Sequence, residues 1–209
     1  MFRWRRRLLF APLVLALATG AAPALSAATA APAAAADNVI TVTGGSATTV
    51  TAPGVVNKLI GAGIAPLALP PGTLSLSGPL TSLTGTTAFP VNSGSVDFTT
   101  FNGTVQLGGG LLFIHLLPFH VVKLTKLEID IVNGVTTLSA QTPSGSRLAL
   151  FALSLSGATL GGDATHIVIG NLATTITSDG AQFLDSALHT KVFTAGMLFG
   201  TSSSTFEHA

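Results

Sequence analysis

The chain has 209 residues, enough for one sizeable domain, and 47% of them are hydrophobic while only 8% are charged, which argues against a disordered chain. Four of the nine Lys and Arg residues lie in the first seven positions, so the rest of the chain has five basic and eight acidic residues, a net charge of −3. No clustered basic segment remains there, which excludes the electrostatic footprint of a nucleic-acid-binding protein.

The first 28 residues have the pattern of a secretory signal peptide. Four arginines precede an apolar run over residues 8–18, and small residues at 26–28 are suited to cleavage. Residues 29–38 form an Ala/Pro-rich tether, so a single domain is predicted over residues 39–209. We expect a secreted or extracellular protein, with association with the cell wall left open. No later apolar run reaches the length of a membrane span, so no transmembrane segment is expected in the mature protein.

Short strands dominate the predicted domain. Residues 101–107 place Phe101, Val105 and Leu107 on one face and polar side chains on the other, which predicts that Leu107 points inward. The apolar parity then changes between residues 122–124 and residues 127–131, which indicates a β-bulge at residues 125–126.

A hairpin turn is predicted at Asn133-Gly134, because both residues tolerate positive φ, and residues 135–140 form the returning strand. Residues 147–157 are apolar on both faces, as expected of a central strand that is covered on both sides. Further strands are predicted over residues 166–169, 173–177 and 192–199, and short helices over residues 53–61 and 178–189, the second capped by Ser178 and Asp179.

This succession of strands predicts an all-β fold, an antiparallel β-sandwich with one or two short helices. The sequence contains no nucleophile elbow, P-loop, zinc-protease or dinucleotide-binding motif, so it is not expected to be an enzyme. Asp185 and His189 are four residues apart on the predicted helix, which favours a structural surface contact. Asp163 and His166 indicate a turn that leads into a strand.

Two histidines are candidate ligands for haem iron. His115 and His120 lie five residues apart in IHLLPFH, on either side of Pro118, so they converge only if the loop turns back on itself. The alternative is that both are half-exposed loop residues. Neither is expected to bind a metal ion outside haem.

The same loop is strongly apolar, and we expect a contact site there. Its residues are Phe113, Ile114, Leu116, Leu117 and Phe119. Either the loop folds back over one end of the sandwich, or it forms the contact surface for a small hydrophobic ligand, a lipid or another copy of the protein.

A series of segments, in a consistent order over about residues 50–201, resembles the haem-transport-associated (Htaa) domain, and in particular small secreted actinobacterial proteins with one divergent copy of it. The segments are FPVNSGSVD (89–97), GTVQLGGGLLF (103–113), KLTKLEID (123–130), TLSA (137–140), RLALFALSLSGA (147–158) and NLATTITSDGAQFLDSALHTKVFTAGMLFGT (171–201).

The resemblance implies a β-sandwich displayed at or released from the bacterial envelope, with haem capture as its role. Domains of this family bind haem iron through a tyrosine supported by a histidine, but this sequence has no tyrosine. In the small secreted relatives a histidine commonly precedes the glycine pair of GTVQLGGGLLF, where this chain has Leu107. Haem bound by the family's own ligands is therefore not expected, whereas haem bound by His115, His120 or both remains open.

Two functions from different classes follow. The first is a secreted or cell-envelope, non-catalytic binding module that uses the apolar hairpin to bind a small hydrophobic ligand, with haem as the candidate that the family suggests. The second is a structural surface protein that self-associates, since low charge and an apolar hairpin suit homotypic assembly.

Overall fold

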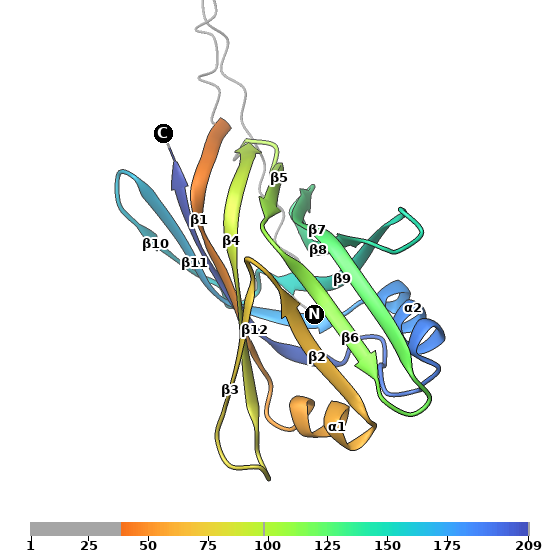
Figure 1. The fold of residues 1–209 in the computed structure, drawn as a ribbon. Helices are drawn as coiled ribbons and strands as arrows, with labels where there is room; N and C mark the ends of the chain where they lie inside the picture. The colour runs from red at the N-terminus through yellow and green to blue at the C-terminus, as the bar shows by residue number, and fades with distance from the viewer. Residues whose placement is uncertain (1–38, 98, 209) are drawn as a thin grey trace, which may run out of the picture. The chain divides into compact units, whose positions relative to one another are not determined.

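The computed structural model describes residues 39–97 and 99–208, so the predicted signal peptide and tether lie outside the described residues. In this part of the chain, twelve strands are joined into one sheet and two short helices accompany them (Figure 1). Every pair of neighbouring strands is antiparallel.

Eight of the described strands close into a barrel, because a ladder between β7 and β8 joins the two ends of the series. In the order in which they pair, they are β7 (His120–Val132), β5 (Asn102–Leu107), β4 (Thr84–Asp97), β1 (Val39–Thr51), β12 (Leu198–His208), β11 (His166–Ile176), β9 (Arg147–Ser154) and β8 (Val135–Gln141).

The predicted β-sandwich is therefore wrong, although the mainly β composition and the two helices are confirmed. A sandwich and a closed barrel impose the same alternation of inward and outward side chains along each strand. The difference lies in which distant strand edges pair, and the sequence pattern does not report that pairing. Because β7 and β8 pair with each other, the eight-stranded series has no unpaired strand at either end.

Four further strands extend the barrel. They are β6 (Gly110–His115), which pairs with β7, β2 (Ile64–Leu69), which pairs with β6, β3 (Thr73–Ser77), which pairs with β4, and β10 (Thr159–Gly162), which pairs with β11. β5 and β6 run in the same direction along successive parts of β7, and Gly108 and Gly109 connect them. Gly109 has a φ of +97°, and a Cβ there would lie 2.5 Å from the Leu69 carbonyl oxygen, so only glycine fits.

The local predictions for the centre of the chain are confirmed. The β7–β8 register shifts between Thr125 and Glu128, and Lys126 in this bulge has a φ of +49°. Asn133 and Gly134 both have positive φ and connect Val132 to its partner Val135. Leu107 is buried in the core.

Two predictions for the C-terminal part are wrong. The strands expected at 166–169 and 173–177 are one strand, β11, whose register with β12 shifts between Ile169 and Leu172. The strand expected at 192–199 is mainly a loop, and β12 begins only at Leu198. β12 has a weak apolar signal because small polar residues, Ser202 and Ser204, occupy buried positions.

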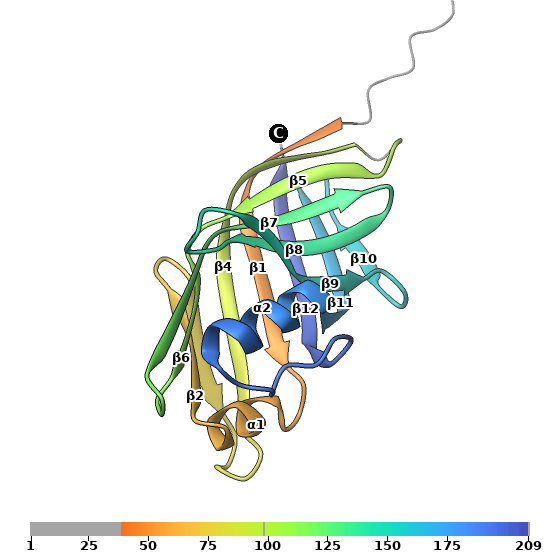
Figure 2. The same ribbon diagram turned by 90° about the vertical axis from the view of Figure 1, so that its right-hand side faces the viewer.

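The helices are α1 (Val55–Gly61) and α2 (Ser178–Leu188). α2 packs against β9 and β7 (Figure 2). Its N-cap is Thr177 instead of the predicted Ser178 and Asp179, and the Thr177 hydroxyl accepts a hydrogen bond from the Gly180 N–H at 2.9 Å. Gly180 lies against β9, where a Cβ would come within 2.5 Å of the Leu150 carbonyl oxygen.

We predict that Gly180→Ala destabilises the domain, although alanine has the higher helix propensity. The propensity gain is at most about 1 kcal/mol, whereas a methyl group forced against β9 costs about 1–3 kcal/mol. Urea unfolding followed by circular dichroism should give a lower free energy of unfolding than for the unmodified chain. Ser186→Ala, on the exposed face of α2, is the control; an equal or higher stability of Gly180→Ala would contradict the close packing.

Candidate functional site

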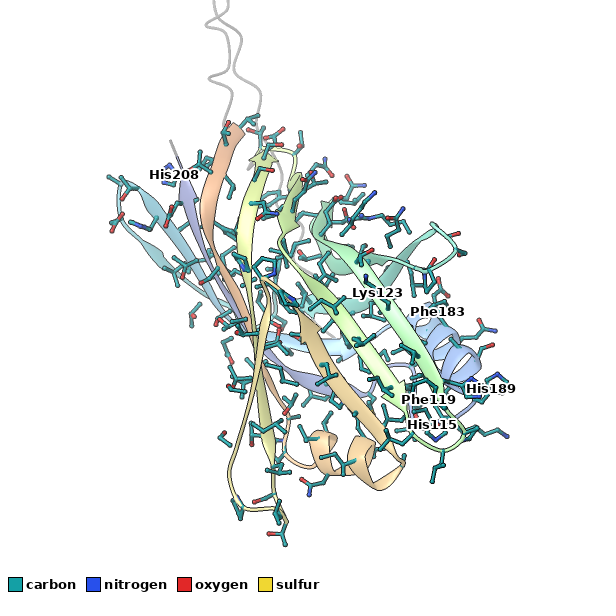
Figure 3. The ribbon with its side chains drawn as sticks, in the orientation of Figure 1. His115, Phe119, Lys123, Phe183, His189 and His208 are labelled. Carbon is teal, nitrogen blue, oxygen red and sulfur yellow. The ribbon has the colours of Figure 1, made fainter. Side chains whose placement is uncertain are left out.

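Three histidines come together where the β6–β7 hairpin meets the C-terminal end of α2. His115 and His120 are direct partners in the β6–β7 ladder, so their side chains share one face of the hairpin. His189 caps α2, and its ring stacks on His120 with centroids 4.2 Å apart and planes 2° apart. Figure 3 shows His115, Phe119 and His189 at this end of the molecule and His208 at the far end.

The buried side chain of His115 links the β6–β7 hairpin to the end of α2. Its Nδ1 lies 2.7 Å from the carbonyl oxygen of Leu188. A carbonyl oxygen can only accept, so Nδ1 carries the proton and donates. The opposite side of the ring faces Gly63, where a Cβ would lie 3.7 Å from Nε2. His115 therefore connects the hairpin to the end of α2 and is not presented to solvent.

The turn beyond His115 projects instead of folding back. The exposed fractions are 55% for Leu116, 87% for Leu117 and 71% for Phe119. Of the other residues predicted for the contact loop, Ile114 is half-buried and Phe113 is buried, with its ring in an edge-to-face contact with Phe193. The predicted contact loop therefore divides into a base in the core and an exposed tip.

The two stacked histidines lie beside this tip. His120 is half-buried and His189 is exposed. We call the set of Leu116, Leu117, Phe119, His120 and His189 the tip surface. Within residues 39–97 and 99–208, no group of three or more His, Asp or Glu side chains is arranged to hold a metal ion.

His189 was not among the residues predicted for the site. The sequence places it four residues after Asp185 on a helix, but His189 has a left-handed conformation, with a φ of 52°, and so leaves the helical path. The Asp185 carboxylate instead accepts a hydrogen bond from the Phe193 backbone N–H at 3.1 Å. The one sequence signal for the position of His189 was the end of the apolar helical pattern at Leu188. That signal marks the end of the helix but does not specify which way the next side chain points.

Asp163 and His166 form the turn that the sequence predicts, between β10 and β11. One carboxylate oxygen of Asp163 accepts the backbone N–H groups of Thr165 at 2.8 Å and of His166 at 2.9 Å. The Thr165 N–H, followed by the His166 side chain, holds the pKa of the Asp163 carboxyl well below its usual range. This group stabilises a turn and is separate from the tip surface.

These features define a small β-barrel domain with two short helices and an exposed apolar hairpin. Neither described helix has the length and apolar character needed to span a bilayer. No protein-family model matches the sequence, and no curated protein is significantly similar to it.

Two solved structures that are similar to this chain are both structures of the same domain. The C-terminal domain of HtaA from Corynebacterium glutamicum is 17% identical, with a TM-score of 0.54, and the match covers 81% of this chain and 99% of that one. A domain-swapped dimer variant of the same domain is 16% identical, with a TM-score of 0.47, over 73% of this chain and 89% of that one. The first similarity shows that the described part of the chain shares the fold of that HtaA domain.

We predict different outcomes for two histidine substitutions. His115→Ala leaves the Leu188 carbonyl without its partner in a buried place and should lower the free energy of unfolding by about 1–3 kcal/mol. His120→Ala removes a half-exposed ring and should change it by less than about 1 kcal/mol. Urea unfolding of both variants measures the difference, and equal losses would refute the structural role of His115.

Proposed function

We propose that the domain is a non-catalytic binding module of the haem-transport-associated type, which acts outside the cell or at its envelope. Its contact site in this proposal is the tip surface. The supporting observation is that the highly exposed Leu117 and Phe119 lie beside the stacked imidazoles of His120 and His189. Contiguous apolar side chains at a projecting turn are costly to keep in water unless they meet a partner.

Haem is the ligand that the family suggests, and the residues of this chain fit it only in part. The chain has no tyrosine, Leu107 is buried, and His115 is buried with its Nε2 side against Gly63. His120 and His189 are accessible, and a neutral imidazole is a competent axial ligand for haem iron. In our proposal one of these two rings holds the iron while Leu117 and Phe119 cover part of the macrocycle.

We predict that haemin titration of the purified protein produces a saturable shift of the Soret band. The double variant His120→Ala/His189→Ala should weaken binding by more than about 10–100-fold, the range seen when only an outer partner of a metal ligand is lost. Either single variant should bind less weakly than the double variant, because one imidazole remains.

The matched control is His166→Ala/His208→Ala, which removes two histidines far from the tip surface and should leave the titration unchanged. An unchanged shift in His120→Ala/His189→Ala would remove the tip histidines from the proposal. No shift in the unmodified protein would remove haem.

Self-association is the second candidate function, and the 87% exposure of Leu117 favours it. If the tip surface binds another copy, sedimentation velocity should show a mass that rises with concentration. Leu117→Asp/Phe119→Asp should keep the protein monomeric, because burying a carboxylate in an apolar contact is strongly unfavourable. Leu80→Asp is the control, since Leu80 is 83% exposed but lies in the turn between β3 and β4. A concentration-independent mass would exclude this function.

A further inference from the structure

A cavity of about 180 Å³ lies inside the barrel, lined by residues near the start of β1 and the end of β12. Figure 1 shows these two strand ends side by side at one end of the barrel. Seven of the eight barrel strands contribute to its wall, all except β5. The wall is aliphatic and aromatic, with Ile129, Leu153, Ile169 and Phe206 among its side chains, and it contains no charged residue. The cavity shares no residue with the tip surface.

The entrance to this cavity is also apolar. Three of its residues are exposed: Phe101 at 57%, Leu155 at 44% and Leu160 at 78%. Two turns at the entrance are tied together, because the Gly134 N–H donates to the Phe101 carbonyl at 3.0 Å and the Asn133 N–H donates to the Asn102 side chain at 2.8 Å. The entrance is thus held by two hydrogen bonds from the Asn133-Gly134 backbone, while its apolar side chains are exposed.

One polar group in the wall lacks a partner. Thr136 is 7% exposed, and its hydroxyl has no hydrogen bond to any described residue. In register it lies between Ile131 of β7 and Leu153 of β9, and all three side chains line the cavity. A buried hydroxyl without a partner is unfavourable, so the site is incomplete without a group that bonds to it.

Other buried hydroxyls in the barrel have hydrogen-bond partners. Ser202 on β12 pairs with the hydroxyl of Thr49 at 2.7 Å and with that of Thr174 at 2.6 Å. The Thr51 hydroxyl accepts the Gly85 N–H at 2.8 Å. The unpaired state of Thr136 is therefore not a general property of the interior.

We propose that this cavity is a binding site for a small, neutral, mainly hydrocarbon molecule that carries one hydrogen-bonding oxygen. The hydrocarbon part fills the barrel, and the oxygen bonds to the Thr136 hydroxyl. A charged ligand is disfavoured because the wall offers no group of opposite charge. An apolar cavity of about 150 Å³ accommodates benzene, so this one holds a ring or chain of roughly six to eight non-hydrogen atoms. The exposed entrance accommodates the remainder of a longer molecule. This site is additional to the proposed contact at the tip surface.

The test uses phenol and toluene, which have the same number of non-hydrogen atoms and differ by a hydroxyl in place of a methyl group. Calorimetric titration of the purified protein should show saturable binding of both. In Thr136→Val, which keeps the shape and removes the hydroxyl, the ratio of phenol affinity to toluene affinity should fall about 2- to 12-fold. The same variant without ligand should have a higher urea midpoint, because an unpaired buried hydroxyl is gone.

A second pair of variants locates the binding. Ile169→Phe fills the cavity from β11 and should abolish binding of both compounds. Val168→Phe, the adjacent residue on the same strand with its side chain on the outer face, should leave binding unchanged. If Ile169→Phe does not fold, the phenol-to-toluene affinity ratio in Thr136→Val still tests whether the compounds bind in this cavity.

Absence of binding of either compound, or binding that survives in a folded Ile169→Phe, would overturn the site. An unchanged phenol-to-toluene ratio in Thr136→Val would overturn the role of the oxygen. Because these variants leave the tip surface intact, their failure is distinguishable from failure of the haemin titration.

Discussion

The ladder between β7 and β8 is the contact on which the rest of the structure depends, because it closes the sheet into a barrel. Closure gives the barrel one continuous interior, with the α2 side chains packed at one end and a cavity at the other. It also determines the position of the tip surface. β7 pairs along one side first with β6 and then with β5, and only the β5 part belongs to the barrel. The β6–β7 hairpin therefore extends past the barrel, and its turn is exposed.

The bulge in β7 allows this one strand to belong both to the barrel and to the β6–β7 hairpin. The change at Lys126 brings Leu124 and Leu127 to the interior although they lie an odd number of residues apart, and both are essentially fully buried. Alternation in the sequence revealed this bulge, as it revealed the Asn133-Gly134 turn, because both are local events. The architecture was not predicted, because ring closure depends on pairing between distant strands. β12 was misplaced since its inward positions carry Ser202 and Ser204, which give no apolar signal.

The site was predictable to a similar depth. The strongly apolar composition of residues 113–120 indicated a contact site, and in the structure Leu117 and Phe119 are exposed. The meeting of His115 with His120 follows from a hairpin register that places the turn at residues 116–119, which the sequence does not fix. The partnership with His189 requires the packing of α2 on the hairpin, a contact between segments about 70 residues apart. The barrel cavity was invisible in the sequence for the same reason, since its wall comes from seven strands.

The two ends of the barrel have different chemistry because the described chain has few charged side chains with which to build a polar site. At the α2 end, imidazoles and exposed apolar groups lie on the surface, and the buried ring of His115 is bonded through Nδ1 to a helix carbonyl. Inside the barrel, polarity comes from hydroxyl groups. Most of the buried hydroxyls discussed above bond to one another or to the backbone, so the interior tolerates them at little cost. Thr136 differs in facing an apolar cavity with a free hydroxyl, and a single such group gives a hydrocarbon site its orientation as well as its selectivity.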